Sequence, residues 1–402
     1  MNLVLTIIAA ILTILILIFI PKFISKRIER QFAIDDLQKA VSLHDLENKI
    51  RQTIAQIIGG VILLFGAYTT IEKIGQDQKG RLDNKFYECT IELSRTDTLN
   101  NLRKLGAIYM LEDIANELPE QYYHTSIEVF TQYLKINHNV IKSFDTIPDV
   151  MKGAVMNVLA RRQFYFGKGE KFPLNLTSLN LRGVQVENSN FDETLFLNSD
   201  LSNSHFSNSS FSGANFNEAI VKNASFFNCD FTRAQLGSVK FNSTNIAGCN
   251  FSNASLWSTD FRKAQMAIAM DNFFSNEVDF TGADLLFSNL DSLDLRSVIL
   301  KDADLAGASL RYCDLSEVNM ENARFWGATQ NDKPIPTDLS FSNLKKANLL
   351  GADLQDAILI NADLSESNIE KAYSLEGANL TSVKGLTIEQ KKKCKELGAI
   401  GL

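Results

Sequence analysis

The sequence predicts an α+β protein in which helices come first and a solenoid of very short strands follows. Two long stretches near the start carry no charged residue, and the next hundred residues place apolar residues at helical spacing. From Leu176 onward a bulky apolar residue recurs at every fifth position. A period of five matches neither a helix, with a period of 3.6, nor a strand, with a period of 2. We therefore expect a backbone that turns a corner every five residues.

Composition indicates an ordinary folded protein. The chain has 402 residues, 45% of them hydrophobic and 22% charged, which leaves room for two or three domains. The net charge of −7 argues against a general nucleic-acid binder. Five cysteines without a Cys-x-x-Cys pair disfavour a disulfide framework and a zinc ribbon. A count of 27 Phe against 6 Pro is the unusual feature.

Residues 1–74 are predicted to form a membrane anchor with two spans. Residues 3–20 contain no charged residue and, as a helix, would be roughly 27 Å long, close to the hydrocarbon thickness of a bilayer. A signal peptide fits poorly, because no Lys or Arg precedes this run and no small-residue cleavage site follows it. The second span is placed at residues 53–71, with a buried or interfacial helix as the alternative. Small residues that permit close packing of such helices are Gly59, Gly60 and Gly66.

Residues 75–171 are predicted to form a helical adaptor. One apolar face is expected from Leu99 to Ile114, including Leu102 and Tyr109. Pro119 begins a second helix, whose apolar face contains Tyr123, Ile127, Phe130 and Leu134. Pro148 is well placed to start a third helix, over residues 149–162.

Residues 172–385 contain the repeat. Nineteen successive positions, from Leu176 to Met266 in steps of five, are bulky and apolar. A small residue such as Ala214 or Ser199 stands two positions before the bulky one, and Asn, Asp or Ser usually stands one position before it. We therefore expect one large and one small side chain to point inward from each repeat.

This organisation resembles that of bacterial membrane-anchored pentapeptide-repeat proteins. The resemblance is carried by residues 48–60, by Gly75-Gln76, by residues 103–115 and by the repeat itself. It implies that four repeats close a coil of twenty residues in a right-handed quadrilateral β-helix. Residues twenty apart then stack, which predicts a ladder of four rings, Phe191, Phe211, Phe231 and Phe251. Cys229 and Cys249 would be neighbours about 4.8 Å apart, either as two small buried thiols or as a disulfide.

The register changes twice. Steps of fourteen residues separate Met266 from Phe280 and Phe325 from Leu339, one residue short of three repeats. About thirty-eight repeats would make roughly nine coils and roughly 45 Å of rod. In residues 386–402, Thr387 and Gln390 match a capping box that starts a short basic helix, which would cover the open end of the last coil.

No constellation of catalytic residues is visible, and we expect no enzyme activity, no cofactor, no metal site and no small-molecule substrate. The four histidines share no motif with Cys or paired carboxylates. Residues 271–385 carry nineteen acidic and nine basic residues, which predicts an acidic wall on the distal coils. Asp at the position before the bulky residue also suits the turning backbone, because its side chain can accept hydrogen bonds from the amides that follow. The wall is formed by Asp284, Asp294, Asp304, Asp314, Asp353 and Asp363.

Exposed aromatic residues are the remaining signal. Trp257 and Trp326 each follow an inward residue and should point outward, and Phe273 and Phe274 lie in the first register break. We expect these four residues to form a contact surface, since aromatic residues are enriched at interface hot spots. The alternative is that the rings only cover loops.

The predicted function is a membrane-tethered scaffold that presents a rigid β-helix to a protein partner or to a second copy of itself. One alternative is a membrane effector in bacterial stress or phage defence that oligomerises through its spans. Another is an acidic DNA mimic that binds a topoisomerase. The seven Lys and Arg residues of the loop at 22–51 would place the C-terminal part outside the cytoplasm. The unpaired cysteines and the family favour an inner-membrane protein whose C-terminal part is cytoplasmic.

Overall fold

The computed structural model describes residues 80–95, 101–139, 149–166, 168–266 and 277–402, with isolated positions at 23, 27, 48–50, 52, 53, 56, 59, 60, 269, 270, 273 and 274. The predicted span 3–20 lies outside the described residues, and so does most of the span 53–71. Within the described residues, no helix combines the length and the apolar character that a membrane crossing requires.

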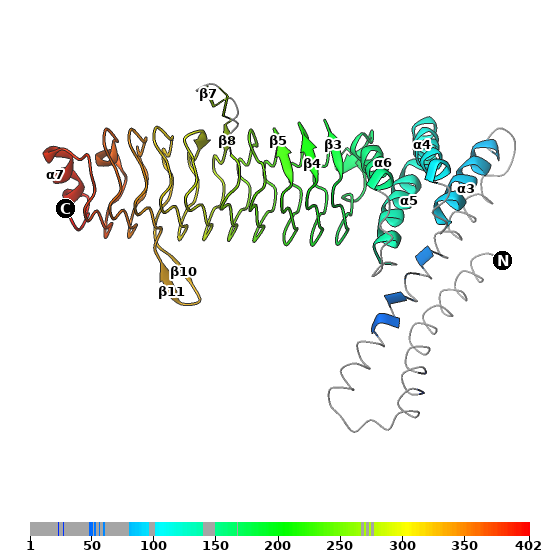
Figure 1. Cartoon of the computed structure of the whole chain (residues 1–402), viewed down its shortest axis with the longest axis horizontal. Helices are drawn as coiled ribbons and strands as arrows, with labels where there is room; N and C mark the ends of the chain where they lie inside the picture. The colour runs from blue at the N-terminus through cyan, green and yellow to red at the C-terminus, as the bar shows by residue number, and fades with distance from the viewer. Residues whose placement is uncertain are drawn as a thin grey trace. The chain divides into compact units, whose positions relative to one another are not determined.

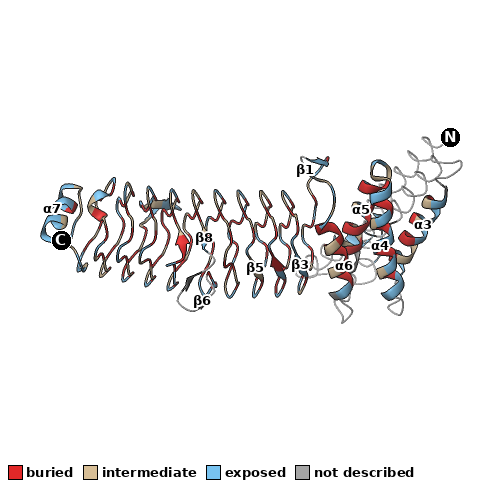
Figure 2. Ribbon diagram, turned by 90° about the horizontal axis from the view of Figure 1, so that it is seen from above, coloured by how far each residue is buried: buried red, intermediate tan, exposed pale blue. Residues whose placement is uncertain are grey.

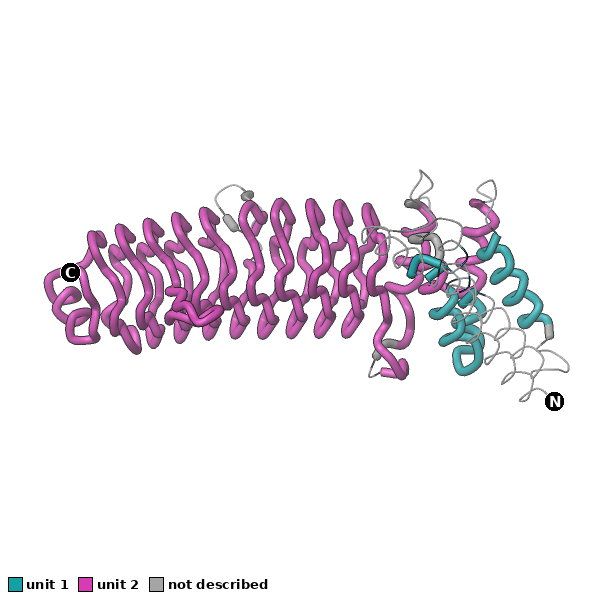
Figure 3. Tube along the Cα trace, turned by 90° about the horizontal axis from the view of Figure 1, so that it is seen from below, with its two compact units in different colours: residues 1–97, 113–129 teal, residues 98–112, 130–402 magenta. Residues whose placement is uncertain are grey.

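The chain divides into two compact units, one made of residues 1–97 and 113–129 and the other of residues 98–112 and 130–402 (Figure 3). In the first unit, helix α3 (Gly80–Ser94) buries Asp83 and Phe86. The hydroxyl of Tyr122 donates a hydrogen bond to the Asp83 carboxylate, and its ring lies 5.3 Å from that of Phe86. This buried polar pair is satisfied within an otherwise apolar cluster.

Three more helices follow, α4 (Asn101–Glu117), α5 (Pro119–Asn139) and α6 (Asp149–Ala160). The predicted helix starts at Pro119 and after Pro148 are confirmed. The predicted apolar face of α4 is partly wrong, because Leu102 is 84% exposed and Tyr109 is 38% exposed. Tyr109 instead lies under the guanidinium of Arg161, 5.6 Å from its ring centre. Helix propensity and spacing do not show which side of a helix a neighbouring element covers.

The second unit contains the β-helix, which is a stack of coils (Figure 1). The bridges between coils give each coil four sides. Parallel bridges join residues twenty apart, as in Asn190↔Ser210, which confirms the expected coil of twenty residues. We name the four sides by their inward ladders: face A starts at Phe191, face B at Phe196, face C at Leu201 and face D at Phe206. These inward residues are buried, whereas the corners are exposed (Figure 2).

Most of the ladder consists of single bridges, and only a few segments are long enough to count as strands. In the coils these are β3 (Gln185–Glu187), β4 (His205–Ser207), β5 (Ser225–Phe227), β8 (Val278–Asp279) and β9 (Val298–Ile299), all paired in parallel. Two short strands, β1 (Tyr165–Phe166) and β2 (Gly169–Glu170), precede the coils.

The side chain one position before each inward residue explains how the corners form. Asp230 Oδ1 accepts a hydrogen bond from the amide of Thr232 at 2.9 Å, and Asn250 does the same for Ser252. The residue two positions after the inward one has a positive φ, as in Asn198 with φ 58°. Asn, Asp and Gly tolerate this left-handed conformation best. The turn chemistry therefore selects the polar residues of the repeat.

The predicted phenylalanine ladder is confirmed. Stacked rings on face A have centroids 5.6 Å apart for Phe191 and Phe211, and 5.0 Å apart both for Phe211 and Phe231 and for Phe231 and Phe251. Phe280 adds a fifth ring at 5.2 Å from Phe251. Each such pair contributes about 0.5–1.5 kcal/mol beyond the area that it buries.

Cys229 and Cys249 are free, buried thiols in the small-residue slot of face A. The Cys249 thiol points at the carbonyl oxygen of Phe226, with Sγ 2.7 Å from it. Burial raises the pKa of Cys229 to about 12 and raises the pKa of Cys249 well above its usual range. Both side chains therefore act as small core residues.

Each fourteen-residue step consists of one ordinary five-residue step and a nine-residue insertion, so the breaks are insertions into a corner and not shortened sets of three repeats. Across the breaks, bridges join residues 29 apart, as in Asn250↔Asp279 and Asp314↔Asn343. Antiparallel strands β6 (Ala269–Met270) and β7 (Phe273–Phe274) belong to the first insertion, and β10 (Ala328–Gln330) and β11 (Lys333–Ile335) to the second. The first leaves the corner between faces D and A, and the second the opposite corner, between B and C (Figure 1).

The C-terminal cap is confirmed. Helix α7 (Ile388–Glu396) has the complete capping box between Thr387 and Gln390. Gln390 also donates to the carbonyl oxygen of Ser367 at 3.0 Å, and Cys394 is fully buried. The 3₁₀ helix η2 (Ile369–Lys371) absorbs one extra residue, since the next bridge, Asp353↔Ser374, spans 21 residues.

The first coil is joined to α6 through a buried arginine that sequence inspection missed. Arg162 donates to the carbonyl oxygens of Leu159, in α6, and of Asn190, in the coil, at 2.8 and 2.7 Å. Its guanidinium pairs with Glu170 at 3.1 Å, and both side chains are almost inaccessible to solvent. Arg162 therefore satisfies the Leu159 carbonyl group at the C-terminal end of α6 and connects this end to the β-helix.

Candidate interaction surfaces

The outward side chains of the coils are the candidate site, because the inward ones fill the core. Among the described residues, no group of three His, Cys, Asp or Glu side chains is arranged to hold a metal ion. The faces and corners of the β-helix differ in charge and in the exposure of apolar side chains.

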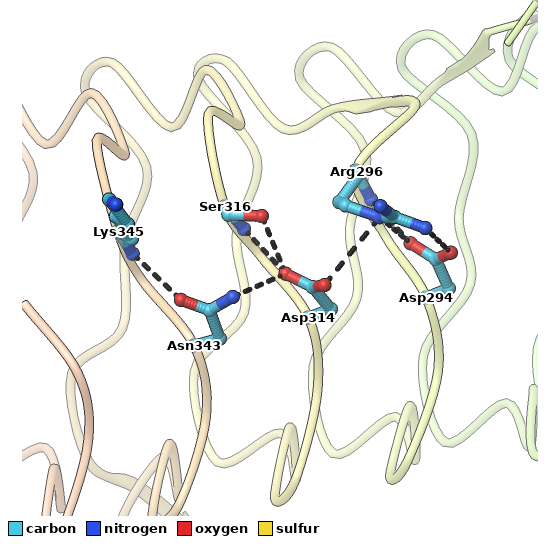
Figure 4. A network of polar contacts seen from close by, with 6 residues as sticks. All are labelled: Asp294, Arg296, Asp314, Ser316, Asn343 and Lys345. Atoms are coloured by element: carbon cyan, nitrogen blue, oxygen red, sulfur yellow. Dashed lines mark hydrogen bonds and ion pairs between the residues drawn. The ribbon is translucent and has the colours of Figure 1, made fainter. Parts of the chain in front are cut away.

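Face D carries charges that neutralise one another (Figure 4). Arg296 binds Asp294 at 2.6 Å on its own coil and Asp314 at 3.5 Å on the next. Asp314 also accepts hydrogen bonds from Ser316 and, at 2.9 Å, from Asn343. The hydrogen bond from Arg296 lowers the pKa of Asp294. A partner that docked on face D would have to displace these internal pairs.

The expected acidic wall is not one surface. The ladder places Asp284, Asp304 and Asp353 on face B, whereas Asp294, Asp314 and Asp363 lie on the opposite face D. All six accept an amide hydrogen bond from the residue two positions on. The structural reason for Asp in this slot is therefore confirmed, and a continuous acidic wall is not formed.

The two tryptophans lie on one corner of the β-helix. Trp257 and Trp326 occupy equivalent positions after face B, three coils apart, and are 47% and 44% exposed. At the strand spacing they are about 14 Å apart along the axis. Leu286 and Ala306 occupy the coils between them. We call this corner the tryptophan edge: Trp257, Leu286, Phe287, Ala306, Trp326 and the β10–β11 hairpin.

Small residues support the rings of this edge. A Cβ atom on Gly237 would collide with the Trp257 indole, so the indole rests on this glycine of the preceding coil. A Cβ atom on Gly307 would lie 2.7 Å from the ring of Phe287. Ala306, one coil before Trp326, is 1% exposed. The edge is thus built from neighbouring small and aromatic residues, which hold the rings against the coil.

The four predicted contact residues are not brought together. Strand β7, with Phe273 and Phe274, belongs to the insertion at the corner between faces D and A, opposite the tryptophan edge. Of the predicted packing glycines, Gly59 and Gly60 are helical, and a Cβ atom on either would meet nothing within 4 Å. Gly66 lies outside the described residues.

A second aromatic feature was missed by the sequence analysis. Tyr312 and Phe341 stack at 4.8 Å on the corner between faces C and D and are 55% and 44% exposed. Arg311 lies over the Tyr312 ring. The two residues are 29 positions apart, so only a register that includes the insertion pairs them.

The closed four-sided coil with a five-residue period defines a β-helical solenoid. A family model described as pentapeptide repeats matches it in eight copies, over residues 180–217, 194–233, 229–266, 288–327 and 337–372. The matched residues all lie in the β-helix, which therefore contains pentapeptide repeats.

Solved structures of pentapeptide-repeat proteins are among those that show similarity to this chain. HetL, a pentapeptide-repeat protein involved in heterocyst differentiation regulation from the cyanobacterium Nostoc sp. strain PCC 7120, is 24% identical over 53% of this chain and 85% of its own, with a TM-score of 0.22. Full-length QnrB1, a plasmid-mediated fluoroquinolone resistance protein, is 19% identical over 53% and 95%, with a TM-score of 0.25. A pentapeptide-repeat protein from the Arabidopsis thaliana thylakoid lumen is 22% identical over 42% and 74%, with a TM-score of 0.14. The search of curated proteins found no match.

Proposed function

We propose that this protein is a non-enzymatic scaffold that uses its β-helix to hold the tryptophan edge toward a protein partner. The observation that carries the proposal is the placement of Trp257 and Trp326 on one corner, both about half exposed. Trp and Tyr are the residues most enriched at the energetic centres of protein interfaces. Two exposed indoles on one ladder form a repeated contact surface, not a scattered set.

The core supports a scaffold role because it leaves the coil little freedom to change shape. Inward residues such as Phe211 and Leu290 are fully buried, and successive coils are joined by backbone hydrogen bonds. Close-packed interiors deform little. The outward side chains are consequently held at fixed spacing along the axis.

The membrane tether belongs to the same proposal. It is supported by the uncharged runs at residues 3–20 and 53–71, each long enough for one span. In this arrangement the anchor sits in a bacterial inner membrane with the β-helix in the cytoplasm. A reporter fused after Leu402 and active only in the cytoplasm tests this topology, and activity of a periplasm-specific reporter would contradict it.

The partner surface is tested by co-purification from native membranes. The variant Trp257→Ala/Trp326→Ala is expected to lose a protein that the wild-type chain retains. Tyr373→Ala is the matched control, because Tyr373 is 77% exposed and stands before face B, not on the corner after it where the two tryptophans lie. Retention of every partner by the double variant would contradict the proposed function. Growth arrest with dye entry on induced expression would favour the membrane effector instead.

A further inference from the structure

We propose that the protein segment docking on the tryptophan edge is cationic and carries arginine side chains. This inference rests on the proposed function and adds the chemistry of the partner. The charges that border the edge, their lack of a paired Lys or Arg and the aromatic rings beside them all favour such a segment.

The charged residues around the distal part of the edge are mostly acidic. Asp284 and Asp353 lie on face B next to the edge, and Asp356 lies on the corner itself, one coil beyond Trp326. A Cβ atom on Gly327, which follows Trp326, would lie 3.6 Å from the Cβ atom of Asp356. The Asp356 side chain therefore adjoins the residues that anchor the hairpin.

These carboxylates differ from Asp294 and Asp314 of face D, which both pair with Arg296, in having no internal cation. Within the part of the chain that the structure describes, Asp284, Asp353 and Asp356 make no ion pair with Lys or Arg. Arg324, on face B, forms an ion pair with Asp304 at 2.7 Å. The negative charge beside the edge is thus available to a partner.

Aromatic rings and unpaired carboxylates together select an arginine-bearing segment. A guanidinium stacks on an indole face and at the same time donates hydrogen bonds to a carboxylate. A lysine satisfies the charge but stacks less well, and a nucleic acid is repelled by the carboxylates. An arginine-bearing segment satisfies both features of the edge.

The chain provides its own probe of this edge. Its only two tryptophans are Trp257 and Trp326, so tryptophan fluorescence of the full-length protein in zwitterionic detergent reports on the edge. We would titrate it with an alternating Arg-Gly decapeptide, and compare Lys-Gly, Glu-Gly and Trp-free Leu-Gly decapeptides and a short DNA duplex. The Arg-Gly peptide is expected to change the emission at the lowest concentration, with an affinity that falls as salt rises.

The matched variants are Asp353→Asn/Asp356→Asn and Asp279→Asn/Asp302→Asn. Each pair removes two carboxylates from equivalent positions of the repeat, the first beside the edge and the second on face A and its corner. The edge pair is expected to weaken Arg-Gly binding by about three- to tenfold, from the usual range for exposed ion pairs, and the control pair to leave it unchanged. Thermal melting confirms that both variants fold.

The outcomes separate this inference from the proposed function. An equal loss in both variant pairs would mean general charge attraction and would overturn the inference. A change in tryptophan emission with the Leu-Gly peptide, the Glu-Gly peptide or the DNA, but not with the Arg-Gly peptide, would also overturn the inference. In that case, loss of a partner by Trp257→Ala/Trp326→Ala would still support the scaffold function. Retention of all partners by that variant overturns the scaffold whatever the peptides do.

Discussion

Phe251 and Phe280 stack with ring centroids 5.2 Å apart and planes within 13°, although 29 positions separate them where other coils use twenty. The phenylalanine ladder therefore crosses the first register break without a gap. The inserted residues lie at a corner of the coil, and the core remains continuous across the break. The second break has the same length and the same effect on the bridges between coils.

Excising the second insertion should leave the β-helix intact. Removal of residues 328–336 joins Gly327 to Thr337 and restores a coil of twenty, with Thr337 still able to donate to the carbonyl oxygen of Leu305. We expect a change below about 1 kcal/mol in the free energy of unfolding, since loop length affects stability only weakly. Urea denaturation measures it. The control deletion removes residues 327–336, which shortens the coil by one residue and is expected to destabilise the protein strongly. A similar loss of unfolding free energy in both deletions would contradict the assignment of residues 328–336 as an insertion.

Truncation in the phenylalanine ladder should be costly. Phe211 stacks between Phe191 and Phe231 and is fully buried. Phe211→Ala is expected to reduce the free energy of unfolding by about 3–5 kcal/mol through lost burial and a residual cavity. Phe341→Ala, at a position 44% exposed, should cost less than about 1 kcal/mol. Comparable shifts of the two urea midpoints would show that the ladder is not the stabilising core.

The five thiols should be unreactive in the folded protein. All five cysteines are buried and free, and burial raises the pKa of Cys313 to about 12 and that of Cys394 to about 11. Because the thiolate is the reactive form, a thiol reagent at pH 8 should label none of them within minutes. In denaturant, five thiols per chain should react. Rapid labelling of Cys229 or Cys249 without denaturant would contradict the closed core.

The ion pair on face D should contribute a small, pH-dependent stability. The pKa of Asp294 is lowered in the folded state by Arg296, so its contribution is present above the unfolded pKa and is lost as the pH falls through the folded value. Asp294→Asn should cost about 0.2–1 kcal/mol at pH 7, the range for exposed pairs. The difference from wild type should vanish near pH 2. A difference that persists there in urea denaturation would assign the effect to something other than charge.

The sequence predicted the repeat well because each five-residue unit carries its own turn chemistry and inward pair. Closure into four sides came from the family resemblance, since a five-residue period alone does not state how many corners complete a coil. The exposure of Trp257 and Trp326 followed from the repeat position of each residue. Their alignment required one step of 29 and two of twenty, which became evident only once the break was known to be an insertion.

Other features depend on tertiary contacts that no local pattern encodes. Leu102 fits an apolar helical stripe and yet is exposed. No local pattern around Arg162 predicts its buried hydrogen bonds to Leu159 and Asn190, which join α6 to the first coil. The stack of Tyr312 on Phe341 likewise required the correct register.

The most direct test of the central claim is site-specific photocrosslinking in the full-length chain in its native membrane. A benzoylphenylalanine at position 286 lies between the two tryptophans, and one at position 316 lies on the charge-balanced face D. We predict a protein adduct of one defined mass from position 286, absent from position 316 and lost in Trp257→Ala/Trp326→Ala. Adducts of equal yield at both positions, or none at position 286, would contradict the claim that the tryptophan edge is the partner surface.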